Sequence, residues 1–130
     1  MADEETRAMA IVVSEGSYDK AMMPLIMGTT GASMGMDVHI FFTFFGLNLL
    51  KKGANPKLPG LFRLMTGWFK KRMKKVGVED FANQLEMAKE LGVRLYACST
   101  TMNVMGMTED QMIEGIGVLG AASFLDIASD

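Results

Sequence analysis

The stretch Arg94–Met107 reads RLYACSTTMNVMGM, and it joins an apolar run to a series of small polar residues. Val93–Ala97 has the apolar and aromatic character of a buried strand, and Thr100–Met105 predicts one or two helical turns. Cys98, the only cysteine among the 130 residues, lies at the junction. A strand that leads directly into a helix is typical of parallel α/β folds. This junction therefore indicates both the fold class and the first candidate functional residue.

Strand and helix patterns continue to alternate on both sides of this junction. The other expected strands are Ala8–Val13, whose unbroken apolar run is typical of a strand buried on both faces, Val38–Thr43 and a weaker Gly115–Val118. The expected helices are Asp19–Gly35, Gly46–Lys52, Leu61–Lys75, Glu79–Leu91, a turn with a capping box at Thr108 and Gln111, and Ala121–Ala128. We expect a single domain over residues 1–130, an α/β fold with three α/β/α layers around a mostly parallel sheet of four to five strands.

The start of the first helix is the least regular part of this pattern. Either Ser17 or Asp19 could cap it. Pro24 predicts that the regular helix begins close to it or that the first turns are kinked, because proline lacks the N–H of an intrahelical hydrogen bond.

Composition narrows the classes of function. The net charge of −2 gives no overall electrostatic attraction for nucleic acid, so no nucleic-acid partner is expected. A single cysteine cannot form a disulfide within the chain, which favours a reducing compartment. The N-terminal MADEETRAMA lacks the basic start of a secretory signal, and no apolar run approaches ~18 residues, so a cytoplasmic protein is expected. The 14 methionines favour adaptable core packing and contacts in a homo-oligomer.

Three loops follow expected strands and should meet at the carboxyl edge of the sheet, where parallel α/β folds bind their ligands. They are Ser14–Asp19, Thr43–Gly46 and Cys98–Thr101. The residues expected to wall a pocket there are Ser14, Gly16, Ser17, Thr43, Gly46, Ser99, Thr100 and Thr101.

Cys98 is the candidate catalytic residue. The free N–H groups and partial positive charge of a helix N-terminus favour a thiolate over a thiol, and the hydroxyl groups of Ser99–Thr101 could hold an anionic sulfur. A persulfide, whose outer sulfur is also anionic, fits the same arrangement. The alternative is a small apolar residue that only packs. Because the chain has no second cysteine, any sulfur relay needs a thiol from another molecule.

His39, the only histidine, shares a strand face with Phe41 and Thr43, and a buried or interface role with one hydrogen bond is expected for it. One cysteine and one histidine are too few for a typical metal site, so neither a metal nor a cofactor is expected. GTTGASMG at Gly28–Gly35 ends a helix and does not follow a strand, so it does not fit a phosphate-binding loop.

Four segments together carry a family resemblance: AMAIVVSEG, GMDVHIFFTFFGLNLLKK, FANQLEMAKELGVRLYACSTTMNVMGMT and GIGVLGAASFLDIA. They resemble the DsrE/DsrF-like family, in particular its peroxiredoxin-like branch. The resemblance implies a three-layer α/β/α domain that forms homo- or hetero-oligomers and passes sulfane sulfur as a cysteine persulfide. Cys98 matches the position of the working cysteine. Peroxidase chemistry also needs a positioned arginine, and the nearest one, Arg94, lies at the other end of its strand.

The segment LPGLFRLMTGWFKKRMKK, at about residues 58–76, resembles an insertion that the smaller members of that family lack. Leu61–Lys75 combines a tryptophan and phenylalanines with a dense cluster of lysines and arginines, which is typical of a helix that lies on an anionic membrane or docks on an acidic partner. The alternative is a helix whose apolar side packs on the domain while its lysines extend into water.

Two functions from different classes follow. The first is an intracellular sulfur carrier, resembling a sulfurtransferase, that exchanges sulfane sulfur through Cys98 with a sulfur-relay protein or a small sulfur compound. The second is a non-catalytic oligomeric binding or scaffold module, in contact with protein or the membrane surface.

Overall fold

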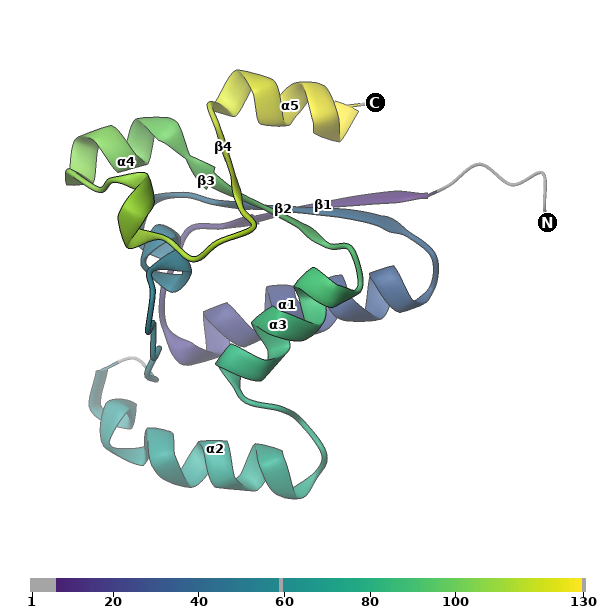
Figure 1. Cartoon of the computed structure of the whole chain (residues 1–130). Coiled ribbons are helices and arrows are strands. Elements are labelled where there is room, and N and C mark those ends of the chain that lie inside the picture. Colours follow the sequence, from purple (N-terminus) through teal and green to yellow (C-terminus); the bar gives the residue numbers. More distant parts are fainter. Residues whose placement is uncertain (1–6, 59, 130) are drawn as a thin grey trace.

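The computed structural model describes residues 7–58 and 60–129, and its centre is a four-stranded parallel sheet (Figure 1). The strands are β1 (Ala8–Val13), β2 (Asp37–Phe42), β3 (Arg94–Cys98) and β4 (Gly117–Leu119), in the order β1-β2-β3-β4. Every pairing is parallel. The carboxyl ends of β1, β2 and β3 therefore lie at the same edge of the sheet, as the alternation of strands and helices predicts.

Helices cover both faces of this sheet. The α-helices are α1 (Tyr18–Ser33), α2 (Thr66–Lys75), α3 (Phe81–Glu90), α4 (Ser99–Met105) and α5 (Ala121–Ser129), and the 3-10 helices are η1 (Phe44–Leu50), η2 (Gly60–Met65) and η3 (Glu109–Gln111). In Figure 1, α1 and α3 lie side by side below the sheet, α5 lies above it, and α2 lies outermost, beyond the layer of α1 and α3. The α/β fold with three layers is confirmed.

The main hydrophobic core lies between the sheet and the layer of α1 and α3. Leu25, Ile40 and Leu47 are completely buried there, and each such side chain contributes about 1.5–3 kcal/mol relative to an exposed one. Gly28 lets α1 approach β2 closely, since a Cβ at Gly28 would lie 3.0 Å from the Cδ1 of Ile40. The glycines at the end of α1 thus serve helix–sheet packing.

The expectation that β1 is buried on both faces is wrong. β1 is an edge strand that pairs with β2, and its side chains alternate between partly buried and exposed positions, with Val12 59% exposed. The reason is the position of α5, which packs through Phe124 on Phe41 and Tyr96 of the two central strands. One face of β1 is therefore packed against the core, and the other face, on the α5 side, stays largely exposed because α5 lies over the central strands.

α1 begins at Tyr18, so a start close to Pro24 is also wrong, and Pro24 lies inside the helix. Buried residues on both sides of the proline, Met22 and Leu25 among them, hold α1 against the core and offset the hydrogen bond that proline cannot make. Ser17 occupies the N-cap position, but its hydroxyl donates to the carboxylate of Asp19 (2.8 Å) and caps no backbone N–H.

The expected helix Leu61–Lys75 is divided into the 3-10 helix η2 and the α-helix α2, which begins at Thr66. The other boundaries agree with the sequence patterns to within about three residues. The expected helix Gly46–Lys52 is the 3-10 helix η1, which begins two residues earlier. The capping box of Thr108 and Gln111 opens η3, where the Gln111 side chain accepts from the Thr108 N–H (3.1 Å). No helix among the described residues combines the length and apolar character needed to cross a membrane.

Candidate functional site

Cys98 is the last residue of β3 and the N-cap residue of α4. Its side chain is 5% exposed and contacts Phe41 and Phe124 in a small apolar cluster on the α5 side of the sheet. The sulfur therefore lies at the first turn of α4, whose N–H groups have no acceptors within the helix.

The polar groups around Cys98 favour its thiolate. Burial alone raises the pKa of the Cys98 thiol, but hydrogen bonding from the N–H and hydroxyl of Thr101, the hydroxyl of Thr43 and the N–H of Thr100 outweighs burial and holds the pKa below its ordinary value. A nucleophilic thiolate is thus more populated at neutral pH than on a free cysteine.

Thr101 connects this turn of α4 to the end of β2. Its buried hydroxyl lies 3.0 Å from the Thr43 hydroxyl and accepts a hydrogen bond from the Phe44 N–H (3.2 Å). Phe44 has a φ of 50°, a left-handed conformation that is uncommon for a bulky residue. This backbone turn directs the Phe44 N–H to Thr101 while its ring stands at the surface, and such strain is typical of functional sites.

A cavity of about 530 Å³ opens beside Cys98. Its lining residues are Phe41, Thr43, Phe44, Phe45, Cys98, Thr100, Thr101, Val104, Met105 and Ala121. None of these residues is charged, and three of them are phenylalanines. Phe44 and Phe45 are 65% and 68% exposed, so the rim of the cavity is an apolar surface. The site therefore places a thiol with surrounding hydrogen-bond donors next to a pocket whose lining suits apolar ligands.

The structure brings four of the predicted site residues together: Cys98, Thr100, Thr101 and Thr43. The other five lie elsewhere. Ser14 lines a separate cavity between β1 and α1, Ser17 precedes α1, and the Ser99 hydroxyl lies near Gly120.

Gly16 and Gly46 shape the cavity because they allow close contacts between backbone segments. A Cβ at Gly16 would lie 2.8 Å from the carbonyl oxygen of Phe45, and a Cβ at Gly46 would overlap the carbonyl of Val13. The two glycines allow η1 to lie against the end of β1 and the following loop. Their position places the aromatic rim of the cavity next to Cys98.

The sequence predicted that the loop Thr43–Gly46 reaches this pocket, but the residues of its apolar lining were not among the predicted site residues. These are Phe41, Phe44, Phe45, Val104, Met105 and Ala121. The available signal was the spacing in FFTFFG, where two aromatic residues directly follow a strand end and precede a glycine. Aromatic residues that lie beyond the end of a buried strand are available to line a pocket at that edge of the sheet.

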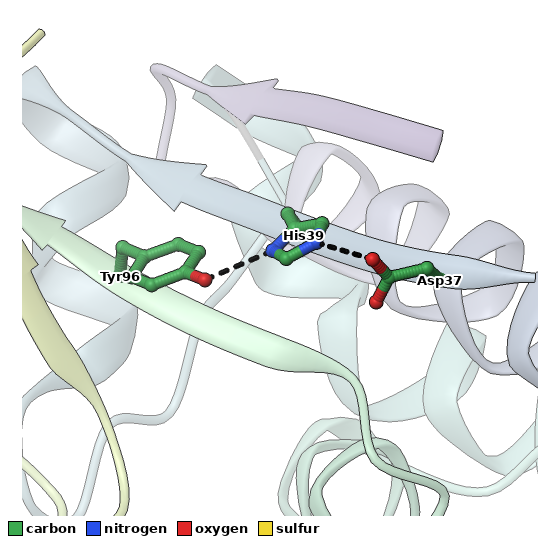
Figure 2. A network of polar contacts seen from close by, with 3 residues as sticks. All are labelled: Asp37, His39 and Tyr96. Atoms are coloured by element: carbon green, nitrogen blue, oxygen red, sulfur yellow. Dashed lines mark hydrogen bonds and ion pairs between the residues drawn. The ribbon is translucent and has the colours of Figure 1, made fainter. Parts of the chain in front are cut away.

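A second polar cluster lies on the same face of the sheet (Figure 2). His39 is buried, its Nε2 lies 3.0 Å from the Asp37 carboxylate, and its Nδ1 lies 2.9 Å from the Tyr96 hydroxyl. The expected single hydrogen bond of His39 is therefore wrong, because the Tyr96 hydroxyl also reaches the ring. Tyr96 contacts Phe124 of α5 edge to face, with ring centroids 6.3 Å apart. This cluster therefore helps to hold α5 against the sheet beside Cys98.

Within residues 7–58 and 60–129, no three His, Cys, Asp or Glu side chains lie close enough together to hold a metal ion.

The fold and the site together define a class of protein: a parallel α/β domain with one cysteine where a central strand meets a helix, beside an apolar cavity. The chain belongs to the DsrE/DsrF/DrsH-like family, whose sequence profile matches residues 5–62 and 58–130.

Two relatives extend over almost the whole chain. The chain is 32% identical over 151 aligned positions to the sulfur carrier protein DsrE2 of Allochromatium vinosum, covering 97% of this chain and 95% of that protein. It is also 32% identical to the uncharacterised protein YrkE of Bacillus subtilis, covering 98% of this chain and 94% of that protein.

Two solved structures share the fold. The E. coli ychN protein has a TM-score of 0.63 at 11% identity and covers 97% of this chain and 94% of its own. The protein of unknown function MTH1491 from Methanobacterium thermoautotrophicum has a TM-score of 0.62 at 15% identity, covering 96% and 93%.

Proposed function

We propose that the protein is a sulfur carrier that accepts sulfane sulfur on Cys98, holds it as a persulfide and transfers it to an acceptor thiol. The observation that carries this proposal is the arrangement of donors from Thr43, Thr100 and Thr101 around a sulfur that lines an apolar cavity. Membership of a family that includes a sulfur carrier supports the same reading.

The transfer is a thiolate displacement. The Cys98 thiolate attacks the outer sulfur of a donor R–S–SH, and a bond forms between Sγ and that sulfur while the S–S bond of the donor breaks. The electron pair of the broken bond leaves as the donor thiolate, and the proton stays on the transferred sulfur. The products are Cys98–S–SH and R–S⁻, with no net oxidation. The acceptor thiolate repeats the same displacement on Cys98–S–SH.

The cavity favours one kind of donor and acceptor. Its lining residues carry no positive charge to neutralise a dianion such as thiosulfate, and the exposed rings of Phe44 and Phe45 favour apolar groups next to the transferred sulfur. A partner relay protein that presents its cysteine on an apolar segment, or an organic persulfide, fits this cavity better than a small inorganic anion.

Mass spectrometry tests the carrier function. Wild type and the Cys98→Ser variant are incubated with polysulfide, thiosulfate, tetrathionate or an organic persulfide, and their intact masses are measured. The proposal expects wild type to gain a sulfur-containing group that a reductant removes, with more adduct from the organic persulfide than from thiosulfate. The absence of any adduct on wild type would contradict the proposal.

The burial of Cys98 favours a second candidate, a non-catalytic oligomeric binding or scaffold module. In this reading the sulfur only packs against Phe41 and Phe124. The exposed side chains of Val12 and Leu125 would support contacts in a homo-oligomer.

Thiol titration separates the two candidates. A Cys98 that reacts in the native protein faster than free cysteine at the same pH supports the carrier. A Cys98 that resists labelling until the protein is denatured supports the scaffold. Light scattering of the native protein gives the oligomeric state in the same series of experiments.

A further inference from the structure

The segment from residue 60 to 76 carries a concentrated positive charge. It contains six lysines and arginines and no acidic residue, and since the whole chain has a net charge of −2, the rest of the chain has a net charge of −8. η2 and α2 span most of this segment and lie at the outermost side of the molecule in Figure 1. We infer that the outer face of α2, formed by Trp68, Lys71, Arg72 and Lys75, binds the surface of anionic lipid membranes.

The inner face of α2 packs against the rest of the domain. Thr66 is buried, its hydroxyl donates to the carbonyl of Arg63 (2.8 Å), and it accepts from the N–H of Leu58 (3.0 Å). The Phe69 ring meets Tyr18 edge to face at 6.0 Å. These contacts fix the rotation of the helix, so the opposite side must face away from the domain.

The outer face follows from this rotation. Trp68, Arg72 and Lys75 are spaced by four and three residues, which places them on one side of a helix, and Lys71 lies beside them. All four side chains are exposed, Trp68 to 57%. The guanidinium of Arg72 lies 5.6 Å from the centre of the Trp68 ring. A tryptophan among cations matches the interfacial region of a bilayer, where the ring lies at the headgroups and the cations meet lipid phosphates.

The residues that precede α2 add apolar surface. Phe62 is 63% exposed and Leu64 is 91% exposed on η2. Apolar side chains of this size and exposure indicate a surface suited to contact with another molecule or a membrane.

The positive charge of this face decides which binding partner is favoured. A second copy of this chain, related by a two-fold axis through this face, would bring cations against cations, which disfavours self-association there. An acidic protein would satisfy the charge, but it would also need apolar groups placed to cover the exposed side chains of Phe62 and Leu64. An anionic bilayer satisfies both, since its headgroups carry the charge and its acyl boundary takes the apolar side chains.

The geometry of the bound state follows from Figure 1. α2 lies beyond the layer of α1 and α3, and α5 lies on the opposite side of the sheet. A protein that rests on a membrane through α2 would therefore turn α5 toward water. Membrane binding does not require the carrier function, and either proposal can fail without the other.

Trp68 is the only tryptophan of the chain, so its fluorescence reports directly on this face. The full-length protein is titrated with phosphatidylcholine vesicles that contain or lack phosphatidylglycerol. The emission of Trp68 should shift to shorter wavelength with the anionic vesicles and stay unchanged with neutral ones. Salt at ~1 M should reverse the shift, because screening then acts within ~3 Å.

A pair of matched variants tests which lysines contribute to vesicle binding. Each lysine near an anionic surface contributes roughly fivefold to the partition constant, so Lys71→Gln with Lys75→Gln should lower it roughly 25-fold. Lys20→Gln with Lys52→Gln changes the net charge equally, outside the segment, and should leave binding within about twofold of wild type.

Three outcomes would overturn the inference. They are no shift with anionic vesicles, equal shifts with neutral and anionic vesicles, or equal losses in the two double variants. Binding to an acidic polypeptide such as polyglutamate, together with no response to vesicles, would replace the membrane with an acidic protein as the partner. Co-sedimentation of a Trp68→Ala variant gives an independent measure, and it should bind more weakly than wild type.

Discussion

The clearest test of the site is the substitution Thr101→Val. Valine keeps the shape of threonine and removes the hydroxyl that contacts Thr43, Phe44 and the sulfur of Cys98. Two effects are expected, one on the reactivity of the thiol and one on the stability of the fold, and each has its own physical cause.

The reactivity should fall because a hydrogen bond to a charged group is lost. Such a bond contributes about 1.5–3 kcal/mol, so the thiolate of Cys98 at a fixed neutral pH becomes about tenfold scarcer or more. The alkylation rate at that pH should fall less steeply than the thiolate population, because a thiolate of higher pKa is intrinsically more nucleophilic. The rate profile of the variant should move to higher pH, because the pKa of the thiol returns toward its ordinary value.

The stability should fall because the Phe44 N–H loses its acceptor. A polar group left without a partner inside the protein costs about 1–3 kcal/mol. Urea unfolding followed by circular dichroism measures this loss.

The assay is the pseudo-first-order reaction of native protein with iodoacetamide from pH 5 to 10, with Cys98→Ser as the blank. Thr29→Val is the matched control, since Thr29 is also buried and its hydroxyl bonds the carbonyl of Ile26 within α1 (3.1 Å), far along the chain from Cys98. This control should keep the wild-type rate profile. A folded Thr101→Val that reacts with the wild-type profile would refute the assignment of Thr101 as a donor to the sulfur.

Three further substitutions test other parts of the structure. Gly46→Ala should destabilise the fold by about 1–3 kcal/mol in urea unfolding, since its Cβ overlaps backbone, whereas Gly67→Ala, with open space around it, should be neutral or slightly stabilising; equal effects would contradict the close approach. Tyr96→Phe leaves the Nδ1 of buried His39 without its partner and should cost about 1–3 kcal/mol by the same measurement, and an unchanged midpoint would mean that this hydrogen bond contributes nothing. Because folding lowers the pKa of Cys98, its ionisation stabilises the folded state fully above the ordinary thiol pKa of about 8.5, and this contribution is lost as the pH falls through the folded-state value. The difference in unfolding free energy between wild type and Cys98→Ser should therefore grow as the pH rises toward 9, and a difference independent of pH would contradict the lowered pKa.

The fold was predictable because its signals are local. The change from the apolar run of β3 to the polar start of α4 at Cys98 occurs within a few consecutive residues. The amphipathic spacing of α3 is also a pattern of neighbouring residues, so both can be recognised in the sequence. The exposure of Val12 was not predictable in this way. An apolar edge strand and an apolar central strand have the same local pattern, and the difference depends on where α5 lies.

The candidate site was predictable in part. The position of Cys98, Thr100 and Thr101 follows from a strand–helix junction, and that of Thr43 from a neighbouring parallel strand. The aromatic rim depends on the left-handed backbone of Phe44 and on close backbone contacts, and neither has a signature in the residue types alone. The second hydrogen bond of His39 depends on Tyr96, which lies 57 positions away in the sequence.

The pairing of Thr43 with Thr101 has a consequence for the newly made protein. The two hydroxyls are 58 positions apart in the sequence and meet after β2 and β3 have paired. A chain still emerging from the ribosome, or one trapped with these strands apart, therefore carries Cys98 as an ordinary, weakly nucleophilic thiol. If the proposed carrier function is correct, misfolded copies would therefore accept sulfur more slowly than folded ones.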